Sequence, residues 1–583
     1  MAPGDLHRLA LPAEPADAAR TPLYFRGAGV RREGGTLRLD PHATADLGTW
    51  LNAAPVGWWR TVVGPGHLRL RVRGSGRLTV WRSTGDSREV AATAELDGAW
   101  ETYLPRTGAD RWMWLELTAG ADGGVLEAVE WAAGSRLGRP EGAARVTVVV
   151  PTFRRERDAT AQVRRLLGPA LDGTVGRVVL VDQGGTLAAG DGWASAAAEA
   201  GDRLVLLHQG NLGGSGGYAR GMVESLRWPD DPVLLLDDDA EIDPESLRRM
   251  HALSVAAPVP TVLGTGLVSA ESGRTLEALA EGVTARTFRW GPVDGLGDGT
   301  DLADGDPTTW RFADPRAQAT YTGWWGTLLP AGTVARLGLP VPYFLKWDDA
   351  EYGLRAGDAG LRRVTMPGAV VWHPTWAAKG TISSWSAWPL HRNRLATATA
   401  RGAGRGVLRD SLVHQVKHVL SLQYETADLW DAALAEVLDG PGWLDTDVLD
   451  DVRLRAQARL DAAPRAPTDV AHRTAPPLPA AVGAVRAVLG LLRPAGGEAV
   501  AVPAAEASWR SGLGRDALAL LGAAGVDRVL VRDPARARTA LRRTVRLHVT
   551  AAVRWAALGR SYRTALPRAR AAGRWQRRFA EVR

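Results

Sequence analysis

The chain has 583 residues, too long for a single hydrophobic core, and predicts three or four domains. Hydrophobic residues make up 45% of the sequence and charged residues 23%, a balance typical of a folded soluble protein. Cysteine is absent, which excludes disulfide bonds, thiolate metal sites and a cysteine nucleophile. The net charge of +7 arises in the last 52 residues, where 15 arginines face two acids, and the rest of the chain sums to −6. The basic charge therefore gives no support to nucleic-acid binding.

The first 20 residues lack the uninterrupted apolar stretch of a signal peptide. No window approaches the ~20 uncharged apolar residues that a membrane-spanning helix needs. We therefore expect a cytoplasmic chain, either free or peripherally bound to the inner face of the cell membrane.

Residues 1–143 show a β-strand pattern. Polar and apolar side chains alternate over 67–73 and 77–82, which predicts a hairpin around the Gly-Ser-Gly sequence between them. Further strands are expected at 111–117 and 125–131, so this part predicts an antiparallel β-sandwich domain. Its tryptophans fit either the core or a sugar-stacking face, with the core favoured for most of them. They are Trp50, Trp58, Trp59, Trp81, Trp100, Trp112, Trp114 and Trp131.

A different pattern begins at Val146 and extends over a domain predicted at 144–395. Apolar strands alternate with helical stretches, which predicts a parallel α/β sheet covered on both faces. Each strand ends in polar or glycine-rich residues, and ligands of such sheets bind at the carboxyl ends of the strands. The predicted strands are 146–153, 177–185, 204–208 and 233–239.

Residues 396–583 are rich in Ala and Leu and predict a helical domain, interrupted by a Pro/Ala linker near 463–479. The Arg-rich tail alternates arginine with apolar residues, including Trp555 and Trp575. That pattern favours an amphipathic surface for anionic lipid headgroups, with a solvated face or a subunit contact as the alternatives.

Three adjacent aspartates, Asp237, Asp238 and Asp239, follow a predicted strand. Carboxylates this close repel one another unless a cation compensates them. On an extended backbone Asp237 and Asp239 point to the same side and can share a divalent ion, and hard oxygen ligands suit Mg²⁺ or Mn²⁺. The alternative is a solvated acidic turn before a helix near Asp243. At the end of a buried strand we favour the metal.

The glycine-rich segment 211–218 precedes a helical stretch predicted at 219–226. Glycines let the backbone approach a ligand, and a helix N-terminus favours anions. Residues 214–219 also fit the GxGxxA pattern of a dinucleotide fold, with Asp237 where a ribose-binding acid would be expected. A dinucleotide-dependent oxidoreductase is therefore an alternative, although the fingerprint normally follows the first strand of such a fold and here two strands precede it. No GK[ST] motif occurs, which argues against a P-loop ATPase.

A second acidic cluster, Asp348, Asp349 and Glu351, lies between Trp347 and Tyr352. A carboxylate shielded by aromatic rings has a raised proton affinity and can act as a general base toward a sugar hydroxyl. The alternative is a helix N-terminus whose acids face the helix dipole.

Two further features lie near this cluster in the sequence. His373 ends an apolar strand and can add a nitrogen ligand to an oxygen-rich metal site, or it is a packed histidine. The pair Trp324 and Trp325 fits a sugar platform or the core equally well.

Together these segments resemble the family-2 glycosyltransferases of GT-A fold. More narrowly, they resemble the polymerising galactofuranosyltransferases that build actinobacterial cell-wall galactan from UDP-galactofuranose. The N-terminal LNAAPVGWWRTV also resembles that family's β-sandwich domain, and the C-terminal helices fit its helical domain, although the last ~100 residues match loosely. The matching stretches are VPTFRRERD, VDQGG, NLGGSGGYARGM, LLLDDDAEID, GWWGTLLP, FLKWDDAEYGLRAG, VVWHPTW and HRN.

The resemblance implies an α/β fold with a Rossmann-like GT-A domain between the β-sandwich and helical domains, and a homo-oligomer. It also implies a role for each matching position. Asp237, Asp239 and His373 would hold Mg²⁺ or Mn²⁺ on the donor diphosphate. Asp349 would be the base, and Asp348 is the alternative that spacing alone does not exclude. The uridine and ribose site would include Phe153, Arg155, Asp182, Asn211 and nearby Asp238, and the acceptor pocket Tyr218, Trp324, Trp325, Asp348, Trp376 and His391.

The implied reaction is a single displacement that inverts the anomeric configuration. The resemblance also implies a lipid-linked glycan as the acceptor and no nucleic-acid partner. A related glycosyltransferase using another nucleotide sugar would carry the same metal and base. A glycan-binding protein with an inert α/β domain is the non-enzymatic alternative, and the intact acidic clusters argue against it.

Overall fold

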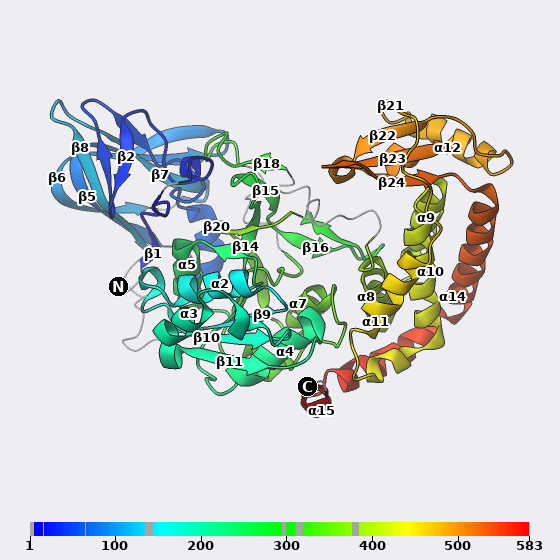
Figure 1. The fold of residues 1–583 in the computed structure, drawn as a ribbon. Helices are drawn as coiled ribbons and strands as arrows, with labels where there is room; N and C mark the ends of the chain where they lie inside the picture. Colours follow the sequence, from blue (N-terminus) through cyan, green and yellow to red (C-terminus); the bar gives the residue numbers. More distant parts are fainter. Residues whose placement is uncertain are drawn as a thin grey trace.

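The computed structural model describes residues 5–15, 17–64, 66–105, 107–133, 144–293, 299–310, 319–375 and 384–581. Figure 1 shows the N-terminal strands, a central α/β layer and a C-terminal helical part in chain order. The exact limits of the three predicted domains stay a prediction.

The N-terminal part is an antiparallel β-structure, as the alternating pattern predicts. Its strands belong to one hydrogen-bonded sheet in the order β2-β3-β8-β5-β7-β4, with β1 on β8 and β6 on β5. The elements are β1 (Asp5–Arg8), β2 (Val30–Glu33), β3 (Thr36–Leu39), β4 (Thr44–Asp46), α1 (Val56–Val63), β5 (His67–Thr84), β6 (Ser87–Pro105), β7 (Asp110–Thr118) and β8 (Gly124–Ala133).

The predicted hairpin at the Gly-Ser-Gly sequence is wrong, because β5 runs through it without a turn. Along one edge β5 pairs first with β8 and then with β7, and the change of partner falls at Gly74 and Gly76. A Cβ on Gly74 would lie 2.3 Å from the Val125 carbonyl oxygen, and one on Gly76 2.7 Å from that of Thr118. The glycines therefore allow two strands to approach a single long one.

The core interpretation of the N-terminal tryptophans is confirmed for most of them. Trp81 and Trp100 are partly exposed. The other six are buried: Trp50, Trp58, Trp59, Trp112, Trp114 and Trp131.

The central sheet is mixed, which corrects the prediction of a parallel sheet. Its order is β11-β10-β9-β12-β19-β14-β15-β18, with β20 on β14 and β13. The four predicted strands are parallel neighbours, whereas β19 runs antiparallel to both β12 and β14. A parallel neighbour needs a crossover connection. The described residues between β14 and β19 form antiparallel pairs instead, β14 with β15 and β16 with β17. The bounds are β9 (Val146–Thr152), β10 (Val175–Asp182), β11 (Leu204–His208), β12 (Val233–Leu235), β13 (Glu241–Ile242), β14 (Thr261–Ser269), β15 (Thr275–Ala278), β16 (Glu281–Val283), β17 (Trp290–Pro292), β18 (Thr300–Asp301), β19 (Thr327–Leu329) and β20 (Arg362–His373).

The glycine-rich segment is part of a helix, which begins at Gly213 and not at Ala219 as expected. A Cβ on Gly217 would lie 2.4 Å from the Cβ of Pro151, and one on Gly221 2.1 Å from a methyl carbon of Val149. These glycines therefore serve the close packing of the helix on β9. The helices of this part are α2 (Glu156–Leu167), α3 (Trp193–Ala200), α4 (Gly213–Ser225), α5 (Pro244–Ala256), α6 (Thr333–Leu337) and α7 (Asp348–Asp358).

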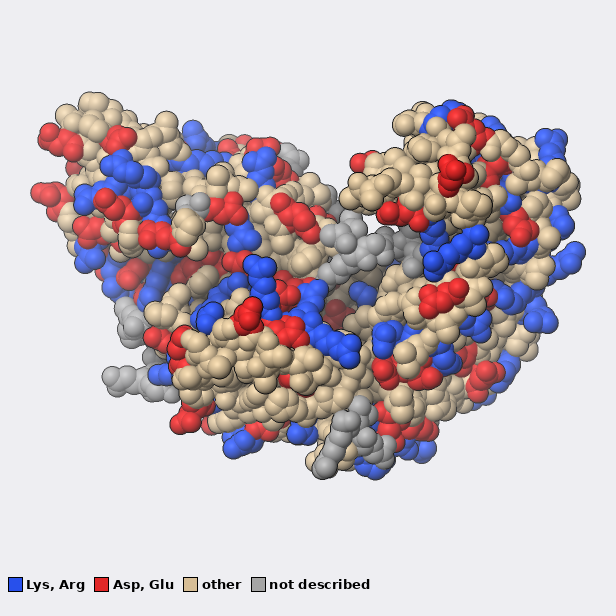
Figure 2. Space-filling model, in the orientation of Figure 1, with Lys and Arg blue, Asp and Glu red and all other residues tan. Residues whose placement is uncertain are grey.

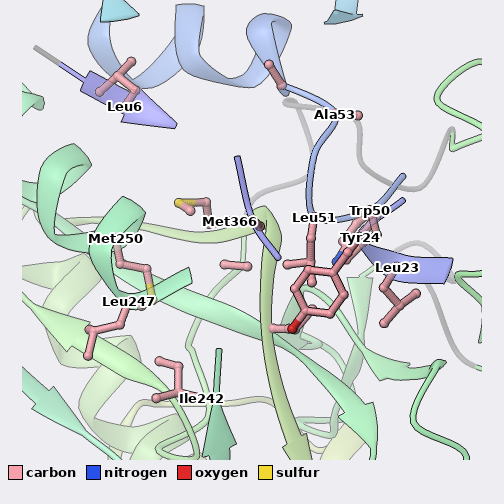
Figure 3. Close-up of a cluster of buried hydrophobic side chains, with 14 of the residues drawn as sticks. Leu6, Leu23, Tyr24, Trp50, Leu51, Ala53, Ile242, Leu247, Met250 and Met366 are labelled. Atoms are coloured by element: carbon pink, nitrogen blue, oxygen red, sulfur yellow. The ribbon is translucent and has the colours of Figure 1, made fainter. Parts of the chain in front are cut away.

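The N-terminal sheet and the central part share a continuous core. Figure 3 shows Tyr24 and Leu51 from the N-terminal part beside Met366 of β20, with Met250 of α5 in the same cluster. The Tyr24 hydroxyl donates to Asp243 Oδ2 over 2.9 Å. Burial of apolar surface thus holds the N-terminal sheet against the α/β layer.

The C-terminal part is helical but also contains a four-stranded sheet that the sequence analysis missed. The predicted Pro/Ala linker contributes its first strand, β21. High alanine content had favoured helix over these short apolar runs, and pairing between strands decided otherwise. The elements are α8 (Ala387–Ala400), α9 (Gly406–Leu420), α10 (Tyr424–Asp439), α11 (Asp451–Asp461), β21 (His472–Thr474), α12 (Ala480–Gly490), β22 (Ala499–Pro503), α13 (Trp509–Gly512), β23 (Ala517–Gly522), β24 (Gly525–Val531), α14 (Pro534–Ala569) and α15 (Ala572–Glu581).

The Arg-rich tail forms the long helix α14, capped by the Asp533 carboxylate on the Arg536 N–H, and the short helix α15. Trp555 and Trp575 are buried, so neither tryptophan lies on the surface predicted for lipid. Among the described helices, none combines the length and apolar character needed to cross a bilayer.

Candidate active site

The two acidic clusters and the histidine lie around one cavity of about 260 Å³ in the central α/β part. Asp237 and His373 line it together with Asp348 and Asp349, although more than 100 residues separate the two acidic clusters in sequence. The remaining lining residues are Gly214, Tyr218, Glu281, Trp290, Tyr321, Trp324, Trp325, Leu345, Lys346 and Trp347.

The sheet brings Asp237, Asp239 and His373 together. The aspartates follow β12, and His373 ends β20, whose last residues pair with β13 just after the aspartates. His373 Nε2 lies 3.1 Å from Asp239 Oδ1 and 3.8 Å from Asp237 Oδ2, and one ligand atom from each of the three falls within 4.8 Å of the others. Two carboxylate oxygens and an imidazole nitrogen fit a divalent cation such as Mn²⁺ or Mg²⁺.

Neighbouring side chains hold this group in place. The Tyr218 hydroxyl donates to Asp237 Oδ1 over 2.6 Å, and Arg155 forms a 2.8 Å ion pair with Asp239. Asp238 points away and accepts a 2.7 Å hydrogen bond from the Thr152 hydroxyl. Burial raises the pKa of Asp238 to about 7, opposed by that hydrogen bond.

The second acidic cluster begins a helix, so the helix-terminus interpretation is confirmed, and two of its acids, Asp348 and Asp349, line the cavity as well. Asp348 and Asp349 are the first residues of α7. The preceding loop is strained, because Phe344, Lys346 and Trp347 all have φ near +70°. Left-handed non-glycine residues cost about 1–3 kcal/mol each and persist only when their surroundings enforce them.

Asn393, in the HRN segment, enforces this loop. Its side-chain amide donates to the carbonyls of Leu345 and Lys346 over 3.0 and 2.9 Å, and more weakly to that of Tyr343. Asn393 is fully buried on α8, so it connects the C-terminal helices to the acids of α7. The HRN segment contributes to the family resemblance, but its sequence alone indicates no role for Asn393.

We expect Asn393→Ala to lower kcat on the order of 10- to 100-fold, since small displacements of a catalytic group are costly. UDP affinity should change little, because the metal-ligating group and its strands are untouched. Steady-state kinetics and calorimetry measure the two effects. Gln415→Ala is the matched control, since Gln415 is an equally buried amide that contacts only C-terminal helices. Equal losses of kcat in both variants would show that Asn393 acts through general stability alone.

Burial gives the two aspartates different proton affinities. Burial and the neighbouring Asp349 raise the pKa of Asp348 to about 8. Burial also raises the pKa of Asp349, to about 6, opposed by the 2.7 Å hydrogen bond from the Ala350 N–H and by Lys346. The Ala350 N–H and Lys346 therefore favour the ionised form of Asp349 over that of Asp348.

This difference predicts a pH dependence of transfer. A general base must be ionised, so kcat/KM should fall as the pH decreases through about 6, where Asp349 gains its proton. Initial rates between pH 5 and 8, at fixed metal concentration, measure it. A profile that stays flat from pH 5 to 7 would contradict Asp349 as the base.

Glu281 is a cavity residue that the sequence analysis missed. Burial and the charge of Asp349 raise its pKa to about 8, and its Oε2 has no hydrogen-bond partner among the described residues. A neutral carboxyl group there can donate a hydrogen bond to a sugar hydroxyl. A single glutamate in the short strand β16 carries no sequence signal for such a role.

The aromatic residues predicted for the acceptor differ in placement. Trp324 is buried and packs edge-on against Tyr218 at 4.8 Å between ring centroids, so it is largely a core residue. Trp325 is half-buried and lines the cavity. Trp376 lies outside the described residues.

His391 is not near the cavity, contrary to the expectation. It is buried among the C-terminal helices, where its ring stacks on Trp430 at 3.8 Å and its Nε2 hydrogen-bonds to Ser411. Burial lowers the pKa of His391 well below its usual value. Its position one helical turn into α8 turns the side chain away from the loop that Asn393 holds.

The residues predicted for the nucleotide follow the neighbouring strands β9, β10 and β11 at the same sheet edge. Asp182 accepts hydrogen bonds from the N–H groups of Gly184 and Gly185, each 2.9 Å. The side-chain oxygen of Asn211 accepts a 3.1 Å hydrogen bond from the Gly213 N–H. Phe153 is 37% exposed, so its ring is available to a base. Of these residues, Arg155 contacts Asp239 of the Asp-Asp-His group.

Comparison with known proteins agrees with this geometry. The family model described as glycosyltransferase-like family 2 matches residues 143–394, and one described as galactofuranosyltransferase-2, domain 3 matches residues 407–581. Among solved structures, GalNAc-T7 with UDP, GalNAc and Mn²⁺ aligns at 12% identity and a TM-score of 0.34, over 46% of this chain and 49% of that one. The match to the family-2 glycosyltransferase model, together with the two relatives described next, shows that the protein is a glycosyltransferase, as predicted, and gives no support to the oxidoreductase and glycan-binding alternatives.

Two curated relatives are both named galactofuranosyltransferase GlfT2. The protein from Mycolicibacterium smegmatis is 32% identical over 459 residues, 74% of this chain and 70% of the relative. The protein from Mycobacterium tuberculosis is 32% identical over 458 residues, 74% of this chain and 71% of the relative. The chain belongs to this galactofuranosyltransferase family.

Proposed function

We propose that the protein transfers galactofuranose from UDP-galactofuranose to a growing galactan or related cell-surface glycan, with inversion at the anomeric carbon. The observation that supports this most is the single cavity that Asp237 and His373 share with Asp348 and Asp349. A diphosphate-binding group and a candidate base thus face the same space, as a displacement reaction requires.

Asp237, Asp239 and His373 would hold Mg²⁺ or Mn²⁺. A divalent cation there supplies positive charge to the diphosphate leaving group. The uridine and ribose would bind at the carboxyl ends of β9 to β11, next to the half-buried Asp238. The residues proposed for that part are Phe153, Arg155, Asp182 and Asn211.

Asp349 is the proposed general base. Its carboxylate takes the proton of an acceptor hydroxyl as that oxygen forms a bond to the anomeric carbon. The bond from the anomeric carbon to the UDP oxygen breaks on the opposite face, and its electron pair leaves with UDP. One displacement converts an α-linked donor to a β-linked product. Burial and the neighbouring Asp349 raise the pKa of Asp348, and in its protonated form Asp348 can donate a hydrogen bond to the acceptor. Tyr218, Trp324, Trp325 and Trp376 complete the proposed acceptor side.

The decisive experiment is incubation with UDP-galactofuranose and a short β-galactofuranosyl acceptor, followed by mass spectrometry. Added mass in steps of one hexose supports the proposal. UDP-galactopyranose and UDP-glucose, tested in parallel, would reveal a different nucleotide sugar by giving the faster extension.

We also propose that the acceptor is lipid-linked and that the protein binds the cytoplasmic face of the membrane as a homo-oligomer. The outer face of α14 supports the membrane part, because Val545, Val549 and Val553 are 48–79% exposed at a four-residue spacing, next to the exposed Arg542 and Arg546. Co-flotation with vesicles containing anionic phospholipid, compared between the wild type and Val549→Asp, tests the contact. Light scattering measures the subunit number.

A further inference from the structure

A second and larger cavity, of about 1070 Å³, lies in the C-terminal part, away from the catalytic cavity. It is bordered by the start of α10, the end of α11, residues 464–468, the end of β24 and the start of α14, with Trp385 on one side. Its volume lies at the upper end of the ~300–1,000 Å³ range of ligand-binding pockets. The function proposed above does not use it.

The lining of this cavity is strongly polar but carries no net charge. Four acids face four arginines, and some of them pair directly: Arg528 and Arg536 lie 3.3 and 3.7 Å from Glu425 Oε1. Figure 2 likewise shows both signs of charge interspersed over the C-terminal lobe. A balanced lining gives no net attraction to a polyanion such as a nucleotide. Paired donors and acceptors instead match the hydroxyl groups of an uncharged sugar.

The lining of the larger cavity also contains apolar and aromatic side chains. Leu422 and Leu530 are buried in the lining, and the half-buried ring of Trp385 offers a flat face. An amphipathic ring of this kind can pack on the C–H groups of a sugar.

Glu425 carries a polar atom that lacks a partner. The residue is 5% exposed, and its Oε2 has no hydrogen-bond partner among the described residues, because both arginines contact Oε1. That oxygen has almost no accessible surface, so it does not itself face the cavity. Glu425 lines the cavity through its remaining atoms, and its ion pairs with Arg528 and Arg536 fix both guanidinium groups there.

A short chain of contacts connects the two cavities. The Trp385 ring lies 6.0 Å from the Phe344 ring, and the next two residues, Leu345 and Lys346, line the catalytic cavity. The lining of the larger cavity thus contacts, through one aromatic pair, the chain segment that enters the catalytic cavity.

We infer that the larger cavity is a remote subsite for the acceptor glycan, which binds sugar units distant from the end that is being extended. The inference rests on the proposed function. It predicts that long acceptors contact both cavities and short acceptors only the catalytic one, so the cavity determines preference for acceptor length.

Initial rates with lipid-free β-galactofuranosyl acceptors, a trisaccharide and one of about ten units, test the inference. We expect Glu425→Gln and Asp527→Asn to raise KM for the long acceptor roughly three- to tenfold, the loss of one hydrogen bond, while kcat and the trisaccharide KM stay unchanged. Asp527 is exposed, so its variant should fold normally. Asp439→Asn is the matched control, because Asp439 is an exposed acid on α10 outside the cavity. Lipid-free acceptors prevent a lipid-binding site from producing the effect.

Wild-type kinetics for both acceptor lengths in both cavity variants would overturn the subsite and leave the proposed function intact, since trisaccharide extension is measured with the same enzyme. If the wild type fails to extend the trisaccharide, the proposed function fails separately. Calorimetric binding of the long oligosaccharide then decides the subsite: weaker binding by Glu425→Gln but not by Asp439→Asn supports it, and equal binding overturns it.

Discussion

Replacing Asp349 with asparagine is expected to abolish glycosyl transfer while leaving UDP binding nearly intact. The amide has the shape of the carboxylate but does not accept the proton of the attacking hydroxyl, and loss of a general base costs about 10²- to 10⁴-fold in rate. The Asp-Asp-His group lies after β12 and at the end of β20, on elements other than α7, so the donor should still bind. The measurements are kcat with a short acceptor and the calorimetric affinity for UDP with Mn²⁺.

Two variants of the same helix serve as comparisons. Asp358→Asn removes an exposed acid at the other end of α7 and should retain activity. Asp348→Asn should lose less activity than Asp349→Asn, because burial and Asp349 raise the pKa of Asp348 and an amide can donate a hydrogen bond as the protonated acid does. The opposite order would assign the base to Asp348, and near-normal turnover by Asp349→Asn would refute its assignment.

Replacing Asp237 with alanine is expected to weaken metal-dependent UDP binding by at least about tenfold. Even outer partners of metal ligands typically contribute 10- to 100-fold to metal affinity, and a direct ligand contributes more. Calorimetric titration of UDP with and without Mn²⁺ measures the effect independently of turnover. In the wild type, EDTA should produce the same weakening.

Tyr218→Phe distinguishes the role of the Asp237 carboxylate from that of the hydrogen bond that orients it. This variant removes the hydrogen bond to Asp237 Oδ1 but keeps the carboxylate, so its metal-dependent affinity should fall much less. UDP binding that ignores EDTA, or that is unchanged in Asp237→Ala, would show that the Asp-Asp-His group does not hold a metal for the donor.

The sequence alone predicted the parts of the site that depend on local pattern. Buried parallel strands appear as continuous apolar runs, and the residues that follow them lie at one sheet edge. Asp237, Asp239 and His373 each follow or end such a run, so their convergence could be expected before any coordinates. The acids at the start of α7 were visible as a cluster between Trp347 and Tyr352.

Only the tertiary structure decided which segments meet. It made β5 one strand with two partners, set β19 antiparallel and formed a sheet within the alanine-rich C-terminal part. It also placed Asn393 at the loop before α7 and His391, two residues earlier on the same helix, among the C-terminal helices. Local side-chain periodicity defines an element and its buried face, whereas pairing and burial between distant segments depend on the free energy of the whole packed chain.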